Sequence, residues 1–271
     1  MTVRNFAASI AMLAMLIAPL AVHAGEWEIV DSVSGFTSPG NVYGPWNSVT
    51  LSDREKIGND KPGIAIVQQN DSDSPHPTHS LETVLDDYHD WSPKFFTYAA
   101  VGVSSGDLLP TRSAYLEGDA KLGTLGATVM GFGAGTVVNP NGVVQNYLNM
   151  GPSWYHNNMN VTLRWLPSFT TGRMGTSTAL FTIANGAEGV SVTTLTLLAG
   201  NQPPNGFVVV ALPNQIGQRA LLGSLDFKHW LNRKGGYDVG IELERLTNSA
   251  SGNMIYVRRA LSVGVFREVG P

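Results

Sequence analysis

The stretch Tyr237-Asp238-Val239-Gly240-Ile241-Glu242-Leu243-Glu244 alternates strictly between large apolar residues and small or acidic ones. Successive side chains of a β-strand point to opposite faces, so the pattern places the tyrosine and the three aliphatic residues on one face and the acidic residues on the other. An amphipathic helix would instead repeat its apolar residues every three or four positions. The stretch therefore predicts a strand with one apolar and one polar face.

The same alternation recurs along the chain. It is clear at residues 113–122, at 159–166, where Leu166 interrupts the polar row, and at 254–266, where Arg259 falls on the apolar face. Candidate strands of this kind lie at residues 27–36, 46–53, 63–71, 79–88, 95–104, 112–121, 125–135, 144–154, 159–168, 176–185, 190–199, 218–231, 237–246 and 254–267. The chain is therefore predicted to be all-β.

Charged residues are unusually scarce. They make up 14% of the chain, against about 25% in an average soluble domain. Residues 122–163 contain no Asp, Glu, Lys or Arg, and residues 174–218 contain only Glu188. No run of about 20 apolar residues follows residue 24, so a helical span is not indicated. The strands themselves are expected to meet lipid, and only a closed barrel leaves no unpaired strand edge in hydrocarbon.

The connections between candidate strands fit such a barrel. With the N-terminus on the periplasmic side, the inner turns fall at residues 90–94, 122–124, 155–158, 186–189 and 232–236, and the opposite side carries the longer connection 200–217. Short inner turns, longer outer loops and an even strand number are typical of transmembrane barrels. We therefore expect an all-β fold, a transmembrane antiparallel up-and-down β-barrel of about 12–14 strands.

Aromatic residues near the strand ends support the same fold, because they gather at both membrane interfaces of such barrels. The expected members of these girdles are Trp27, Trp46, Trp91, Trp154, Tyr155, Trp230 and Tyr237.

The first 24 residues resemble an export signal. Arg4 precedes an apolar stretch from Phe6 to Val22, which ends at Val22-His23-Ala24 before a polar segment. This predicts a signal peptide at 1–24, cleaved after Ala24, and a barrel domain at 25–271 in the outer membrane of a Gram-negative cell. The net charge of −4 gives no indication of a nucleic-acid partner, and the chain has no cysteine for a disulfide or a thiol nucleophile.

No catalytic or metal-binding motif stands out. The histidine-rich window His76-Pro77-Thr78-His79 lies in a proline-containing loop and lacks the rigid spacing of a metal pair, so we expect no metal and no cofactor. Candidate bases for a hydrolase are His79, His89, His156 and His229, which follow no fixed-spacing signature. The glycine-rich run 131–135 has no following lysine and does not resemble a phosphate loop.

The best functional candidates are the polar residues expected to face the lumen. They are Glu117, Asp119, Lys121, Arg164, Asp226, Lys228, Glu242, Glu244 and Arg258. In a filled barrel these charges neutralise one another, whereas in a wider barrel they line water. Both alternatives remain open from the residues alone, although mutual neutralisation is favoured.

Several strand motifs resemble the YaiO-type outer-membrane barrel family. They are Tyr98-Ala99-Ala100-Val101-Gly102-Val103-Ser104-Ser105, Leu109-Pro110-Thr111-Arg112, Tyr115-Leu116-Glu117-Gly118, residues 148–155, residues 160–164 and residues 259–264. The resemblance implies an outer-membrane barrel of poorly defined role, some of whose relatives carry helical-repeat modules and are suspected of surface-polysaccharide traffic. The chain departs from the usual barrel ending, because no aromatic residue follows Phe266. The implied partners are outer-membrane lipid, the barrel-assembly machinery and polysaccharide-export components.

The function expected from these features is that of a non-enzymatic outer-membrane barrel, either a narrow pore or an accessory to envelope or polysaccharide export. One alternative is an outer-membrane hydrolase acting on lipid or peptide. Another is a soluble periplasmic β-barrel that binds an apolar ligand, against which the scarcity of charge argues.

Overall fold

The computed structural model describes residues 25–41, 44–71, 78–122, 128–170, 176–200 and 218–269. The predicted signal peptide lies outside these residues, and its cleavage stays a prediction.

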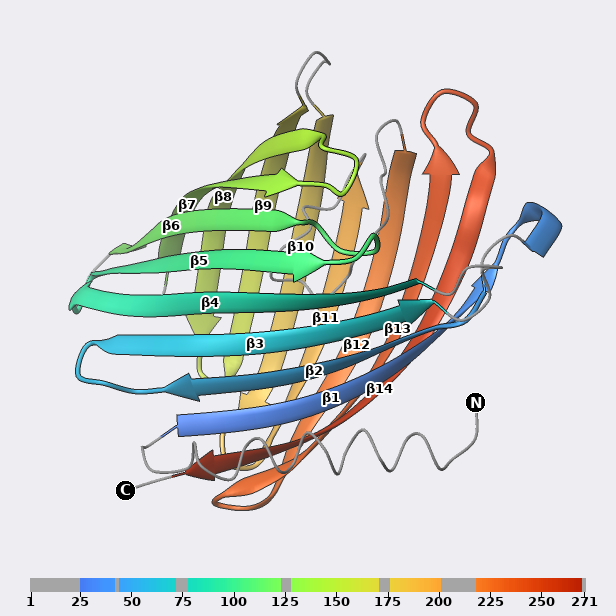
Figure 1. Ribbon diagram of the computed structural model, residues 1–271. Helices are drawn as coiled ribbons and strands as arrows, with labels where there is room; N and C mark the ends of the chain where they lie inside the picture. Colours follow the sequence, from blue (N-terminus) through green and yellow to red (C-terminus); the bar gives the residue numbers. More distant parts are fainter. Residues whose placement is uncertain are drawn as a thin grey trace.

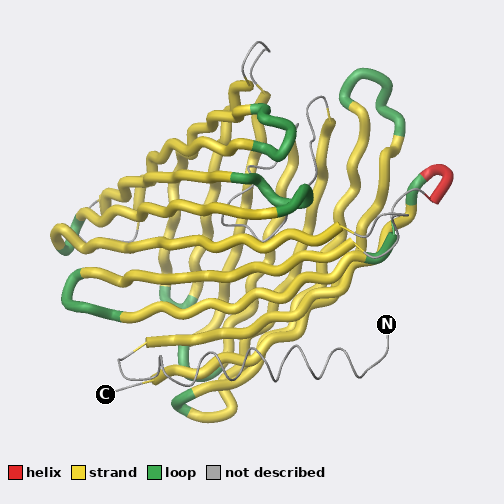
Figure 2. Tube along the Cα trace, in the orientation of Figure 1, coloured by secondary structure: helices red, strands yellow, loops and turns green. Residues whose placement is uncertain are grey.

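Fourteen strands make up nearly all of the described chain (Figure 1). They are β1 (Gly25–Thr37), β2 (Trp46–Glu55), β3 (Asp60–Asp71), β4 (Thr78–Ser92), β5 (Phe95–Ser105), β6 (Arg112–Leu122), β7 (Thr128–Val138), β8 (Val144–His156), β9 (Met159–Thr170), β10 (Thr176–Ala187), β11 (Ser191–Gly200), β12 (Gln218–Asn232), β13 (Gly235–Asn248) and β14 (Met254–Val269). A short 3-10 turn, η1 (Pro39–Asn41), follows β1. Figure 2 shows the same arrangement as a tube, with loops confined to the two ends of the strands.

The strands close into one antiparallel barrel in chain order. Closure depends on β1, which pairs with β2 on one side and with β14 on the other, so that Ile29 lies opposite both Leu51 and Val265. No described strand is left as an edge, which is the condition for a sheet in hydrocarbon. The expected all-β barrel is confirmed, with fourteen strands.

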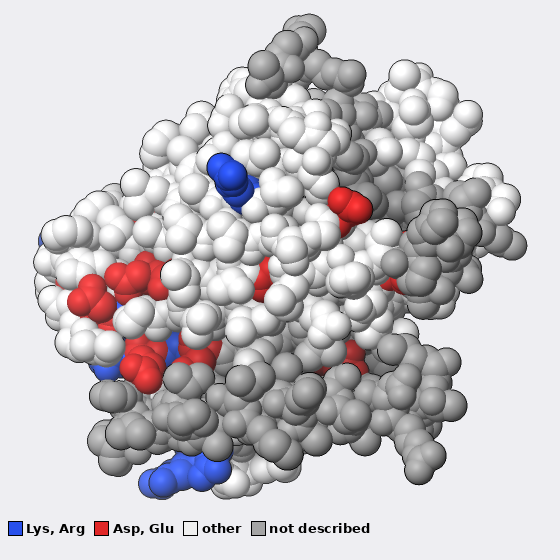
Figure 3. All heavy atoms as spheres, in the orientation of Figure 1, with Lys and Arg blue, Asp and Glu red and all other residues white. Residues whose placement is uncertain are grey.

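The outer face of the barrel is apolar. On β13, Ile241 and Leu243 are 56% and 54% exposed, whereas the next residue, Glu244, points into the lumen and is 0% exposed. On β6, Leu116 is 60% exposed while its neighbour Tyr115 is buried inside. A soluble barrel would bury the apolar row and expose the acidic one, so this arrangement fits lipid and not water outside. In Figure 3 most of the visible face is uncharged, and acidic side chains gather where β3 begins and β4 ends.

Connections differ between the two ends of the barrel. At the end that carries Gly25, the described turns are short, as at residues 157–158 and 233–234. Asn157 takes the left-handed conformation there, with a φ of 50°, which allows a two-residue hairpin. We call this the periplasmic end and the opposite one the extracellular end, following the usual orientation of such barrels. The expected long connection 200–217 falls almost entirely outside the described residues.

Two details of the expected arrangement were wrong. Trp46 and Trp230 are not girdle residues, because their register places them in the lumen, where Trp46 packs against Phe36 and Trp230 against Phe266. By contrast, Trp91 and Trp154 are exposed at the periplasmic end. The strand expected at 125–135 is β7 at 128–138, because alternating glycines blur its apolar period.

No helix among the described residues is long and apolar enough to span a membrane.

Single cysteines test which face meets lipid in this cysteine-free chain. We expect cysteines at Val239 and Ile241 to react with lipid-soluble labels, and cysteines at Glu242 and Glu244 to react only with water-soluble labels or not at all, because the two pairs point to opposite faces. The measurement is labelling of the protein in outer-membrane vesicles. The reverse pattern would contradict a lipid-facing apolar row.

Candidate functional site in the barrel lumen

One side of the lumen, facing β5 to β8, is filled by stacked tyrosines. The Tyr115 ring lies 5.8 Å from that of Tyr147 in a stacked arrangement and 6.1 Å from that of Tyr98. All three rings are buried and pack with Ala100 and Val137. This side of the barrel is therefore closed by its own side chains.

Beside the tyrosines lies a buried charge cluster that joins three strands. The guanidinium of Arg164 lies 3.2 Å from Glu117 Oε1 and 3.6 Å from Asp119 Oδ1. Its Nη1 also donates to the carbonyl of Gly151 at 2.5 Å. Glu117 accepts further hydrogen bonds from the Tyr115 hydroxyl and, at 3.0 Å, from Asn149 Nδ2. Partners on several sides are what make buried charges tolerable.

The inner face of β7 makes room for these groups because it carries glycines. A Cβ on Gly131 would lie 2.5 Å from Glu117 Oε1, one on Gly133 would lie 2.6 Å from the Tyr115 hydroxyl, and one on Gly135 would lie 2.3 Å from the Tyr147 ring. The glycines at 131, 133 and 135 therefore leave room for side chains of neighbouring strands to lie directly against the backbone of β7.

A second buried cluster lies on β13 and β14. Arg258 Nε donates to Glu244 Oε2 at 3.0 Å, and its Nη2 pairs with Glu242. The hydroxyl of Tyr256 donates to Glu244 Oε1 at 3.3 Å. Toward the extracellular ends of the strands, this cluster adjoins a group of buried apolar residues, namely Leu198, Ala220, Leu222, Leu246 and Tyr256.

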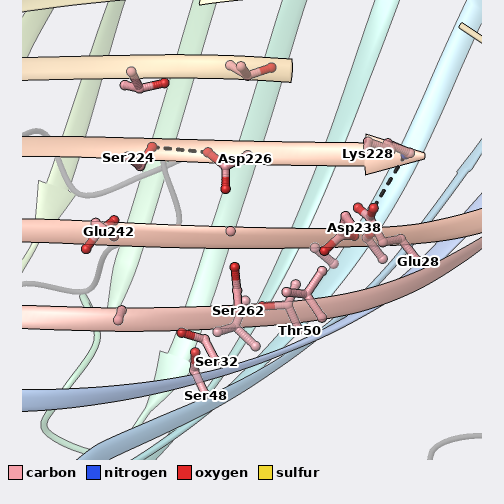
Figure 4. Close-up of a pocket in the computed structure, with 18 of the residues that line it drawn as sticks. Glu28, Ser32, Ser48, Thr50, Ser224, Asp226, Lys228, Asp238, Glu242 and Ser262 are labelled. Atoms are coloured by element: carbon pink, nitrogen blue, oxygen red, sulfur yellow. Dashed lines mark hydrogen bonds and ion pairs between the residues drawn. The ribbon is translucent and has the colours of Figure 1, made fainter. Parts of the chain in front are cut away.

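The rest of the lumen holds a cavity of about 1000 Å³. Its wall carries many hydroxyls, including those of Ser32, Ser48, Thr50, Ser224 and Ser262, which Figure 4 shows around a common space. Eight carboxylates also line it, from Glu26, Glu28, Glu82, Asp86, Glu188, Asp226, Asp238 and Glu242, against three cationic groups, from Arg54, Lys228 and Arg258. The wall is therefore polar and carries an excess of acidic groups.

Each of the three cationic groups is engaged by carboxylates. Arg54 lies 2.6 Å from Asp86, and Lys228 pairs with Glu26 and lies 3.4 Å from Glu28. Arg258 is held in the second cluster. Among the described residues, the wall carboxylates Glu82, Glu188, Asp226 and Asp238 form no ion pair, and Asp226 accepts only from Ser224 Oγ at 3.1 Å. The negative charge of the wall is therefore not neutralised by its own cations.

Toward the periplasm this cavity adjoins another one. A second cavity of about 670 Å³ shares Glu26, Glu28, Arg54, Asp86 and Glu188 with the first. Its outer rim adds the cationic residues Lys56, Lys61, Arg233 and Lys234. At the other end, Leu180, which packs against the extracellular apolar group, lines the cavity.

All nine predicted lumen residues lie in the inward register. Glu117, Asp119 and Arg164 form the first cluster, Glu242, Glu244 and Arg258 the second, and Asp226 and Lys228 line the cavity. Lys121 lies at the periplasmic rim, 5.8 Å from the ring of Phe96.

Sequence reasoning missed the acidic wall on β1 and β4, formed by Glu26, Glu28, Glu82 and Asp86. The alternation of Glu26 and Glu28 with Trp27 and Ile29 could have revealed the first two.

The histidines point away from this cavity. His229 lies on the outer face beside Phe227 and Tyr237, and His156 stacks on Trp154 at 5.3 Å. His89 Nδ1 lies 2.5 Å from Asp60 Oδ1, also on the outer face, and His79 precedes the inward-facing Ser80. No described histidine lines the cavity, and no group of three or more metal-ligating residues gathers in the described part of the chain. His76 lies outside it.

A family model described as the YaiO membrane beta barrel domain matches residues 28–205. The chain belongs to the YaiO barrel family. A search of curated proteins found no significant match. Membership of this membrane-barrel family places the protein in the outer membrane.

Solved structures share the fold of the YaiO barrel at low identity. The "CymD monoaromatic hydrocarbon channel" has a TM-score of 0.60 at 10% identity, over 91% of this chain and 88% of that one. A "Bacterial polysaccharide outer membrane secretin" has a TM-score of 0.55 at 10% identity, over 91% and 98%. Omp33 of Acinetobacter baumannii has 0.51 at 8%, over 90% and 98%. At such identities the likeness concerns the fold alone.

Substituting Gly135→Ala should destabilise the YaiO barrel, because the new methyl group would meet the buried Tyr147 ring. We expect the free energy of unfolding in lipid vesicles to fall by about 1–3 kcal/mol, as measured by urea titration. Ala134→Val, one residue away on the outer face, is the control and should change it little. Equal effects of the two substitutions would show that β7 has no special packing role.

Proposed function

We propose that this protein is a narrow, water-filled channel that passes small polar solutes across the outer membrane. The observation that carries the proposal is the polar cavity of about 1000 Å³ inside the barrel, which shares wall residues with a second cavity at the periplasmic end. A cavity of this size holds a small organic molecule. Its hydroxyls and carboxylates favour hydrated solutes over apolar ones.

The charge of the wall supports a preference for cations. Eight carboxylates face three cationic groups, and those three are held in ion pairs. Acidic groups lining a pore with low-dielectric walls concentrate cations and repel anions. Glu82 and Asp226 contribute to this preference, because neither forms an ion pair among the described residues.

The extracellular half of the lumen limits the flow. The apolar group around Leu222 and Leu246 occupies the inner wall above the Arg258 cluster, and Tyr256 joins the two. Apolar constrictions restrict ion passage because they are poorly wetted. We therefore expect a low conductance.

A second candidate is a role as an accessory to surface-polysaccharide export. It is supported by the hydroxyl-rich wall, where Thr50, Thr194 and Thr196 could exchange hydrogen bonds with sugar hydroxyls. Deletion that abolishes surface polysaccharide, together with purified barrels that conduct no ions, would favour this candidate over a channel. The histidines, which face away from the cavity, give a hydrolase no comparable support.

Planar-bilayer recording tests the channel. The purified barrel should conduct ions, and Thr196→Trp should lower the conductance by roughly a factor of two or more, because the indole would occupy the cavity. Leu197→Trp, the next residue on the outer face, is the matched control and should conduct like the parent protein. A parent barrel without conductance would refute the channel.

Reversal potentials in a potassium chloride gradient test the preference for cations. The parent channel should favour potassium, and Glu82→Gln combined with Asp226→Asn should weaken that preference, because both remove unneutralised charge from the wall. Asp31→Asn removes an acidic group on the outer face of β1 and should leave the potential unchanged. An anion-selective parent channel would contradict the proposal.

A further inference from the structure

Three arginines lie on the outer face of consecutive strands near the extracellular end. They are Arg219 on β12, Arg245 on β13 and Arg259 on β14, and all three are exposed. Each follows the outward register of its strand, as shown by its neighbours in the same row, Leu221, Leu243 and Leu261. We call these residues the arginine patch.

The strand register brings the three side chains together. Arg245 lies opposite Leu221 on β12 and opposite Val257 on β14. Arg219 and Arg259 each lie two residues from those partners, so both are diagonal neighbours of Arg245. Such neighbours are about 7–8 Å apart, within reach of long side chains.

The patch also lies close to one level of the membrane. A path that starts at Ser191, at the periplasmic end of β11, can be followed from each residue to its paired residue on the next strand. It passes through β12, β13, β14 and β1 and ends at Val138, at the extracellular end of β7. Paired positions on successive strands therefore rise toward the extracellular end. From β12 to β14 the arginines step two residues per strand toward the periplasm. The rise of paired positions and the two-residue steps of the arginines oppose each other. The three arginines therefore lie close to one depth in the membrane.

No carboxylate among the described residues accompanies the patch. The extracellular connections that adjoin these strands, residues 38–45, 201–217 and 249–253, contain no Asp or Glu. Glu242 and Glu244 are close in sequence but point into the lumen, where Arg258 holds them. Arg259 Nη1 donates only to the Thr37 hydroxyl, at 3.0 Å, among the described residues. Within the described part of the chain, the patch is therefore a concentration of positive charge without a counter-charge.

An apolar surface begins directly below the patch. Leu221, Leu243 and Leu261 are 61%, 54% and 53% exposed, and each is the next outward residue on the strand of one arginine. Farther toward the periplasm follow Leu225, Ile241 and Val263, all exposed as well. A molecule that fits this surface has anionic groups at one level and hydrocarbon beneath them.

We propose that the arginine patch binds the phosphorylated headgroup of an outer-leaflet lipid whose acyl chains lie along the leucines below. Guanidinium groups bind phosphate oxygens in a bidentate manner, and three of them match a headgroup that carries more than one phosphate. Arg245 at the centre contacts the headgroup together with a neighbour on either side. This site is separate from the lumen and does not depend on the proposed channel.

Lipid binding to the purified full-length protein tests the site. Native mass spectrometry from detergent compares lipid A carrying two phosphates with the same lipid after removal of both. We expect the phosphorylated lipid to bind about tenfold tighter or more, and the preference to disappear in the Arg219→Gln, Arg245→Gln, Arg259→Gln triple variant. A triple variant with lysine at the same positions should keep part of it, because it retains the charge.

A matched control removes three cations elsewhere, with Lys94→Gln, Arg112→Gln and Arg267→Gln, and should keep the full preference. Heat-modified gel mobility verifies that each variant is folded, and the lysine variant serves as the comparison if the glutamine variant is not. Equal binding of the two lipids, or a preference that survives loss of all three arginines, would overturn the proposal. Complete displacement of the lipid by millimolar inorganic phosphate would also overturn it, since it would show a site for free phosphate.

Discussion

Hydrocarbon offers no hydrogen-bonding partner, so every backbone amide and carbonyl that crosses it must be paired within the protein. The pairing of β1 with both β2 and β14 meets this requirement, because it leaves no described strand with an open edge. Closure then fixes the face of the sheet on which each side chain lies. Once the register of one strand is set, each residue along it is assigned to lipid or to the lumen, and a slip of one position would exchange the two faces. The apolar outer surface and the polar interior therefore both follow from the same hydrogen-bonded strand register.

The interior solves two separate physical problems. On the side of β5 to β8, charged groups removed from water are stabilised by one another, and Arg164 is the centre of that arrangement. The glycines of β7 allow it, because their missing side chains leave space for Tyr115 and Tyr147. Elsewhere in the lumen many wall residues are short, among them serines and threonines, and a cavity remains open. The barrel is thus partly filled and partly hollow, and the hollow part is the one that carries excess negative charge.

The outer surface is divided by level. Aromatic residues such as Trp91 and Trp154 mark the periplasmic interface, and the arginine patch marks the extracellular side of β12 to β14. Between them the exposed side chains of these strands are chiefly aliphatic. Positive charge outside and negative charge inside belong to neighbouring residues of the same strands, as with Arg245 and Glu244. The thin wall of a barrel allows this, because adjacent residues face different solvents.

The sequence by itself determined the class of fold, most of the strand positions and the face that each side chain takes. Alternation is a local property, and residues such as Glu242, Glu244 and Arg258 revealed their side of the sheet through their immediate neighbours. Scarcity of charge is likewise read directly from the sequence, and it indicated contact with lipid. The alternation also gives the correct face where the residue type misleads. Trp46 and Trp230 are aromatic, which suggested a membrane interface, but their register turns them inward.

Only the tertiary structure decided how the inward residues are grouped. Arg164 meets Glu117 across 47 positions of sequence, and Lys228 meets Glu26 across 202, because neighbouring strands and closure of the barrel bring them together. The same is true of the cavity, whose wall combines strands from both ends of the chain. A local pattern states which way a side chain points, but the space it shares with others depends on strand number, register and the curvature of the closed sheet.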